Sequence, residues 1–234
     1  GDLKLGAIGT VTYVDGKQMV AFGHPFLKHG SANYFMHNAN IFTVVKSYES
    51  AFKLGSMGRE IGTVTEDRGA GIAGVSGTIS SGIPVRFHLK DIDMGRDKQS
   101  NVKVIEDKDM TPTLAATALY NMLNKTLDRS GAGTAKITYT ITPRNGEQKS
   151  LTRTNMFYSS ESISEKTVDE FYNVIDVLMN NRFINYEIMD INVETEVTQD
   201  KKTAKLVDAA ASSTVVSPGD KIVVDVTLEP YRGE

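Results

Sequence analysis

The sequence predicts a mainly β protein with two helices, an α+β fold. Short runs of β-branched residues separated by glycine-rich turns fill residues 7–90, which is typical of strands joined by tight turns. Two later stretches, near 111–129 and 162–181, place apolar residues three and four positions apart, the spacing of amphipathic helices. The chain has 234 residues, 40% of them hydrophobic, so it can build a proper core.

The first expected element is a hairpin in "IGTVTYVDGKQMVAFG". Its β-branched residues lie on both sides of Asp15-Gly16, a pair that favours a type I′ turn. The pentapeptide "IGTVT" occurs at residues 8–12 and again, unchanged, at 61–65. Two equivalent barrel strands would explain the repeat, and so would chance among β-prone residues.

The first helix is expected over residues 111–129. Thr111 serves as N-cap, Pro112 occupies the first turn and Gly131 stops the run. One face of this helix carries the apolar residues Leu114, Ala118, Leu119, Met122 and Leu127.

A second hairpin, turning at Asn145-Gly146, and a second helix follow. Ser162 and Glu165 form a capping box at the start of that helix, which should end near Asn181. Its inward face carries Val168, Phe171, Ile175, Leu178 and Met179.

The C-terminal stretch alternates through three strands, broken at Gln199-Asp200 and at Pro218-Gly219. We interpret it as part of a β-sandwich. Because three strands make a poor independent domain, it should pack on the preceding helix, or the native polypeptide continues. The expected regions are therefore a β-barrel portion (1–105), a helix-hairpin-helix segment (106–185) and a partial sandwich (186–234).

Charge and composition exclude several classes of function. The net charge is -3 and no basic run is present, so we expect no nucleic-acid partner. No window approaches eighteen apolar residues and the N-terminus lacks the pattern of an export signal, so we expect no membrane span. The absence of cysteine removes thiol chemistry and disulfides, and fits the cytosol or a bacterial cell envelope. A chain that begins with Gly rather than Met suggests a processed piece of a longer protein.

His24 is the first candidate catalytic residue. In "FGHPF" it lies between Gly23, which allows close approach, and Pro25, which fixes the departing chain. A histidine held in this way can act as a general base. The alternative is a partly buried histidine at a strand end whose ring nitrogen bonds a carbonyl.

Other candidates carry weaker signals. Ser76 lies in "GIAGVSG", where glycines make an oxyanion hole only if successive N–H groups converge, and a turn gives the same letters. Asp67 could assist a histidine, although next to Arg68 it fits a local ion pair or Asx-turn equally. The histidines at 24, 29 and 37 lack the spacing of zinc peptidases, so we expect no metal and no cofactor. His88 should be a strand residue that faces solvent.

Two segments, "GAIGTVTYVDGKQMVAFGHPF" and "SAFKLGSMGREIGTVTEDRGAGIAGVSG", resemble the SpoIVB peptidase family, serine peptidases of the chymotrypsin-like clan. The resemblance covers residues 5–90, and the hairpin followed by Gly-His is its most specific part. It implies a chymotrypsin-like β-barrel, an extracytoplasmic setting in a bacterium and a polypeptide substrate. It also gives His24 the role of general base in acyl transfer.

The chain departs from that family at the nucleophile. The family motif Gly-x-Ser-Gly-Ser-Pro occurs nowhere in the sequence, and "GIAGVSG" aligns with a glycine turn rather than with the nucleophile, which argues against Ser76. The serine would lie in a missing segment of the same parent polypeptide, as in longer relatives that look permuted, and this chain alone should be inactive. The C-terminal "VSPGDKIVVDVTLEPYRGE" resembles a strand pair of an immunoglobulin-like appendage.

Two other functions remain open. The chain could be a non-catalytic peptide-binding or scaffold module of the bacterial cell envelope that pairs exposed strand edges with an extended peptide partner. The third hypothesis is that the chain is a purely structural domain of an envelope protein.

Overall fold

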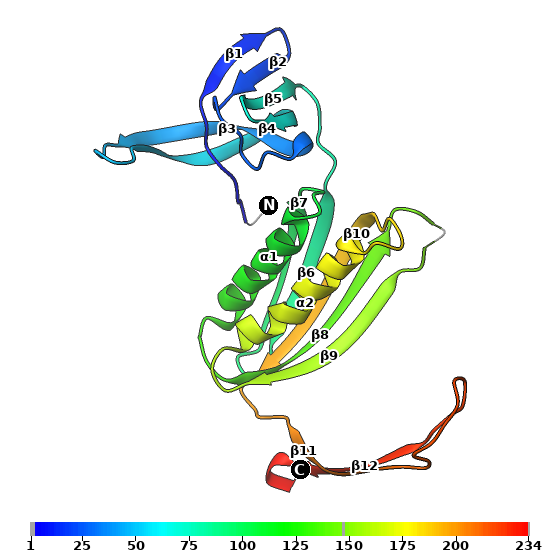
Figure 1. The fold of residues 1–234 in the computed structure, drawn as a ribbon. Helices are drawn as coiled ribbons and strands as arrows, with labels where there is room; N and C mark the ends of the chain where they lie inside the picture. The colour runs from blue at the N-terminus through cyan, green and yellow to red at the C-terminus, as the bar shows by residue number, and fades with distance from the viewer. Residues whose placement is uncertain (1–2, 147, 234) are drawn as a thin grey trace.

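The computed structural model, which describes residues 3–146 and 148–233, contains three open sheets and two helices (Figure 1). This confirms the α+β class. None of the three sheets closes into a barrel over the described residues. Residues 1 and 2, part of the N-terminus that lacks an export pattern, lie outside the described chain.

The first sheet, which we call sheet A, has the strand order β1-β2-β5-β4-β3. Every pair of neighbours in it is antiparallel. Its strands are β1 (Val11–Asp15), β2 (Gln18–Ala21), β3 (Gly30–Val45), β4 (Phe52–Arg68) and β5 (Gly71–Ser76).

The second sheet, sheet B, has the order β7-β6-β10-β8-β9, with β6 and β10 parallel. The helices α1 (Met110–Leu127) and α2 (Ile163–Asn180) pack together on one face of it (Figure 1). Its strands are β6 (Ile83–Asp91), β7 (Arg96–Val104), β8 (Gly133–Pro143), β9 (Leu151–Ser159) and β10 (Ile188–Thr198).

Sheet B takes strands from all three expected regions. β6 and β7, expected within 1–105, pair with each other, and β6 also pairs with β10, which was expected within 186–234. β10 lies between β6 and β8, and its alternate residues Ile191, Val193 and Val197 belong to the core that the sheet shares with the helices. Alternation of this kind fits any sheet with one covered face, so it could not say which sheet the strand joins.

The first helix lies close to its expected range but begins differently. Asp109 precedes it without a side-chain cap, and Thr111 is buried inside the first turn, where its hydroxyl donates to the Ile105 carbonyl. The Asp107 carboxylate accepts the N–H groups of Asp109 and Met110 instead. The N-cap assigned to Thr111 is therefore wrong, because an upstream carboxylate already binds these donors.

The second helix begins as expected, with Ser162 as N-cap accepting the Glu165 N–H. The reciprocal bond of a capping box is absent from this site, because the Ser162 N–H donates to Ser159 Oγ. Phe171, Ile175 and Met179 are buried as expected. In this core, the Phe171 ring meets the Tyr139 ring edge to face with centroids 5.5 Å apart.

The first hairpin forms where the sequence predicts it, with a different turn. Asp15 stays in β1 opposite Gln18, so the two-residue loop is Gly16-Lys17. Gly16 adopts a φ of +56° whereas Lys17 does not have a positive φ. A type I′ turn requires positive φ at both central residues, so that assignment was wrong.

The remaining strands, β11 (Ala204–Ala211) and β12 (Val224–Pro230), form a separate two-stranded sheet, followed by a short 3-10 helix over Tyr231–Gly233. Their side chains are exposed along both strands. No second layer of strands covers them within the described residues. Neither α1 nor α2, the helices of the described chain, is long and apolar enough to cross a membrane.

Candidate functional site

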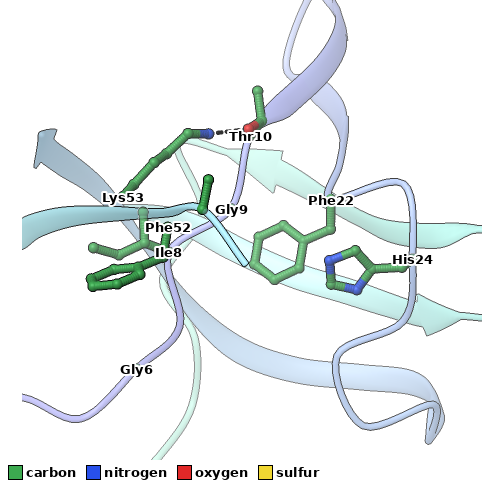
Figure 2. A pocket seen from close by; sticks show the side chains of 9 residues that line it. Gly6, Ile8, Gly9, Thr10, Phe22, His24, Phe52 and Lys53 are labelled. Carbon is green, nitrogen blue, oxygen red and sulfur yellow. Dashed lines mark hydrogen bonds between the residues drawn. The ribbon is translucent and has the colours of Figure 1, made fainter. Parts of the chain in front are cut away.

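His24 lies at the corner that follows β2 and is exposed to solvent. Its ring contacts the Phe22 ring, with centroids 5.5 Å apart, and lines an open cavity of about 480 Å³ (Figure 2). The opposite side of the cavity is formed by Ala51, Phe52 and Lys53 at the start of β4. The sequence therefore placed this imidazole correctly at a strand end, and the structure presents it at a cavity.

One hydrogen bond decides which nitrogen of His24 can act as a base. Nδ1 lies 2.7 Å from the Pro25 carbonyl oxygen. A carbonyl oxygen only accepts, so in the neutral ring the proton resides on Nδ1 and Nε2 keeps its lone pair. This tautomer leaves Nε2 free to act as a general base. The same bond also agrees with part of the structural alternative for His24, in which a ring nitrogen bonds a carbonyl.

The backbone around His24 is strained. Phe22 and Lys28 adopt φ values of +75° and +64°, which non-glycine residues rarely take. Each costs of order 1–3 kcal/mol and persists only where the surroundings enforce it. The Phe22 ring packs over Gly9 (Figure 2), where a Cβ would overlap it. Strained backbone conformations cluster at functional sites, so a strained loop that carries an exposed imidazole fits a functional segment.

Asp67 is buried and holds the loop after His24. Its carboxylate accepts the backbone N–H groups of Phe26, Leu27 and Lys28 at 2.6–2.9 Å. Burial alone would raise the pKa of this carboxyl, but the three N–H donors outweigh burial and lower the pKa. The carboxylate binds the backbone and not the imidazole, so Asp67 positions the loop.

Ser76 lies away from His24. Its Oγ donates to the Lys17 carbonyl at 3.2 Å. In the β2–β5 ladder, Gln18 pairs with Val75 and Ala21 with Ile72. Ser76 therefore lies at the beginning of β2, whereas His24 follows the end of that strand. The structure does not bring the two side chains together.

Sequence reasoning missed a cluster at the junction of the two sheets. His29 contacts two carboxylates, with Nδ1 2.9 Å from Asp107 Oδ2 and Nε2 3.5 Å from Asp109 Oδ2. Tyr34 donates its hydroxyl to Asp107 at 3.3 Å. The hydrogen bond to Asp107 raises the pKa of His29 despite partial burial. Burial favours protonation of Asp107, but its bonds to His29 and to the helix start lower its pKa.

The same three residues offer the ligand atoms that could hold a cation. One atom each from His29, Asp107 and Asp109 lies within 4.8 Å of the others. The atoms already pair with one another as an imidazole between two carboxylates. The cluster therefore works as an ion-paired connection between sheet A and the start of α1. In the sequence, the only indication of this cluster was the pair of carboxylates, Asp107 and Asp109, just before the predicted helix.

The remaining histidines have structural partners. His37 Nδ1 lies 3.1 Å from the Gly58 carbonyl oxygen on the neighbouring strand β4. His88 Nε2 lies 2.7 Å from Asp97 Oδ1, so this strand residue is partly exposed and paired across β6 and β7.

Comparison with known proteins adds little to this geometry. No protein-family model matches the chain, and no curated protein matches it. Among solved structures, it is similar to a superantigen-like protein from Staphylococcus aureus, solved in complex with 3-N-acetylneuraminyl-N-acetyllactosamine. The two are 10% identical with a TM-score of 0.21, over 71% of this chain and 91% of the other. A likeness at this level carries no argument about fold or function.

Proposed function

We propose that the chain is the histidine-bearing part of an exported bacterial serine peptidase of the SpoIVB type. The observation that carries the proposal is the exposed imidazole of His24, which has Nδ1 bound to a carbonyl and borders an open cavity through a strained loop. The family resemblance in residues 5–90 supports the same role for the same residue.

The proposed reaction is peptide-bond hydrolysis through an acyl-enzyme. A serine hydroxyl attacks the substrate carbonyl while His24 Nε2 accepts its proton, and the imidazolium then returns that proton to the leaving amine. Water attacks the ester in the second half-reaction with the same base. Asp67 positions the loop, and the Pro25 carbonyl takes the place usually held by a carboxylate on Nδ1.

The nucleophile of this reaction must come from another segment of the parent polypeptide. Of the residues that line the cavity, Thr10 alone carries a hydroxyl, and its oxygen accepts a hydrogen bond from Lys53. A hydroxyl that accepts from an ammonium group is a poorer nucleophile, because its lone pair is engaged. The chain by itself is accordingly inactive in this proposal. Sheet A would be a portion of a chymotrypsin-like barrel, and β11 with β12 a portion of an immunoglobulin-like sandwich.

A serine-directed phosphonate tests this mechanism in the parent polypeptide. We expect His24→Ala to slow labelling at least about 100-fold, the range for loss of a general base. His37→Ala is the matched control and should label like wild type, because His37 bonds a neighbouring strand. Equal labelling of wild type and His24→Ala, or a parent that contains no Gly-x-Ser-Gly-Ser-Pro motif, would overturn the proposal.

The second candidate is a non-catalytic peptide-binding or scaffold module of the cell envelope. It is favoured by the same lack of an activated hydroxyl beside His24 among the described residues and by the open edges of sheet A. A parent polypeptide without a serine motif would point to this function.

A further inference from the structure

Sheet A contains the same hairpin twice. The two "IGTVT" segments begin at Ile8 and Ile61, and each leads into a hairpin, β1–β2 and β4–β5. Val11 pairs with Ala21 in the first hairpin, and Val64 with Gly74 in the second, at the same separation along the chain. Both hairpins turn through two residues, at 16–17 and 69–70. The two hairpins are therefore structural equivalents, offset by 53 positions.

The irregularities in the hairpins coincide as well. The β1–β2 ladder shifts register between Val11 and Tyr13, and the β4–β5 ladder shifts between Val64 and Glu66. These are equivalent positions under the same offset. A bulge placed identically in two hairpins is a specific feature of a fold, and chance similarity of β-prone residues does not produce it.

The two hairpins are related by a local two-fold axis. In the sheet order, β2 and β5 lie side by side, flanked by β1 and β4. Val20 of β2 lies opposite Ala73 of β5, and these two residues are equivalents under the offset. When a residue pairs with its own equivalent across an antiparallel ladder, a two-fold axis passes between the two residues. The two "IGTVT" segments therefore belong to equivalent strands, and chance similarity does not explain the repeat.

The symmetry fails on the outer edges of the repeat. The outer edge of β4 is covered by β3, with Tyr34 opposite Val64 and Met36 opposite Gly62. The outer edge of β1 pairs with no strand of the described chain. Instead, Ile8, Gly9 and Thr10 line the cavity beside His24, and the side chains of Val11, Tyr13 and Val14 are exposed.

Apart from Asp15 at the end next to the loop, the open edge lacks the features that prevent strand addition. Residues 8–14, "IGTVTYV", contain no charged residue and no proline. Exposed edge strands are commonly protected by such residues, because unpaired N–H and C=O groups are a template for another strand. A bare edge with β-branched and aromatic side chains is suited to receive one.

We propose that the outer edge of residues 8–14 binds an extended polypeptide strand, antiparallel to β1 and in the register that β3 takes on β4. The bound strand resembles β3 in chemistry, with aromatic and apolar side chains such as those of Tyr34, Phe35 and Met36, because the recipient pentapeptide is identical. Main-chain hydrogen bonds supply the affinity and the alternate side chains the selectivity. This goes beyond the peptidase proposal, since it depends on the β1 edge and not on proton transfer by His24.

Val14 supplies a backbone donor to the bound strand. Asp15 and Gln18 pair across the two-residue loop, and the pair that closes such a loop is a hydrogen-bonded pair. Hydrogen-bonded and non-hydrogen-bonded pairs alternate along an antiparallel ladder, so the Val14–Met19 pair directs the Val14 N–H outward. Its equivalent in the second hairpin, Asp67, lies opposite Gly30 of β3, as this reasoning requires.

The probe is a synthetic peptide with the sequence of residues 30–38, "GSANYFMHN", added to the purified chain. We expect saturable binding by fluorescence anisotropy and slower amide exchange of Val14 in the bound chain. Val14→Pro should weaken binding at least tenfold, whereas Val14→Thr, which keeps the N–H and the β-branched shape, should bind like wild type.

Peptides with backbone N-methyl groups test the same contact without altering the protein fold. Methylation of one set of alternate residues should abolish binding and methylation of the other set should not, because only one set faces β1. Binding that is insensitive to both methylated sets and to Val14→Pro would overturn the proposal, as would exchange protection on β3 or β4 in place of β1. Loss of peptide binding with phosphonate labelling of the parent intact would count against this inference alone, and loss of labelling with peptide binding intact would count against the peptidase proposal alone.

Discussion

Sheet A and sheet B differ in how much apolar surface they bury. Sheet B and its two helices enclose one continuous core, in which Tyr139, Phe171, Ile175 and Ile191 are fully buried. The core of sheet A consists of Ala21, Tyr34, Met36, Val64 and Ile72. Sheet A also leaves large apolar side chains exposed, among them Tyr13, Phe42 and Phe52.

This difference indicates that sheet A depends on its surroundings for stability. Burial of apolar surface is the main favourable contribution to folding, and sheet A buries far fewer apolar side chains than sheet B with its helices. Contacts with the sheet B side compensate in part: Lys103 lies over the Phe35 ring at 4.7 Å and donates to the Ser80 carbonyl, and His29 pairs with Asp107.

The candidate site and the open β1 edge both belong to the less stable region. Segments that bind or move are drawn from the low-stability end of a structure, because they must expose groups that a core would bury. Sheet B is then the scaffold, and sheet A the part that meets a partner. Three changes would break or sharpen this comparison.

Phe171→Ala should have the largest effect. Phe171 is fully buried against Tyr139 in the core of sheet B, and loss of such a side chain costs about 3–5 kcal/mol. We expect a lower midpoint of denaturant unfolding and loss of slow amide exchange in both sheets. The comparison variant is Met36→Ala in sheet A, which should reduce protection in that sheet only. If each variant reduced amide protection only in its own sheet and by the same amount, sheet A would not depend on sheet B for stability.

Asp67→Asn should have an intermediate effect, confined to the His24 loop. The amide keeps one acceptor oxygen for three partly buried N–H donors, so one or more of them lose a partner at about 1 kcal/mol, the low end of the cost of an unsatisfied donor. Amide exchange of residues 26–28 measures it, and Glu66→Gln is the control, because Glu66 forms an exposed ion pair with Arg68. The pKa of Asp67 is lowered from 3.8, so this stabilisation is present above that pH and is lost as pH falls. Unchanged exchange at residues 26–28 would show that Asp67 does not hold the loop.

The smallest effect concerns pH at the junction of the sheets. The pKa of His29 is raised, so its stabilisation is complete below 6.5 and is lost as pH rises through the raised value. The pKa of Asp107 is lowered, so its part is lost only as pH falls below 3.8. We expect the junction to be firmest between about pH 4 and 6.5, with an effect below about 1 kcal/mol because the pair is partly exposed.

The protection factors of the Lys28 and His29 amides, which are corrected for the intrinsic pH dependence of exchange, measure this effect. His29→Gln should abolish their change between about pH 6 and 8, and His88→Gln, which removes an ion pair within sheet B, should leave it intact. A pH profile that is the same in wild type and His29→Gln would contradict the assignment.

The sequence by itself determined the local elements of this protein. The helix faces, the Ser162 cap and the hairpin at residue 16 depend on residues within a few positions of one another, so their signals are readable along the chain. The placement of His24 at the end of a strand had the same local origin. The turn type was predicted less well, because the φ of Lys17 depends on how the two strands pair and not only on the turn sequence.

Only the tertiary structure decided how these elements combine. β10 joins β6 and β8 through pairs such as Val193 with Phe87, more than one hundred residues apart, and an alternating strand fits any half-covered sheet. The role of Asp67 depends on a loop forty residues upstream, and the role of His29 on a helix that begins far downstream. The two-fold axis through Val20 and Ala73 exists only once both hairpins pair, because the repeated pentapeptide carries strand propensity but not the identity of its neighbours.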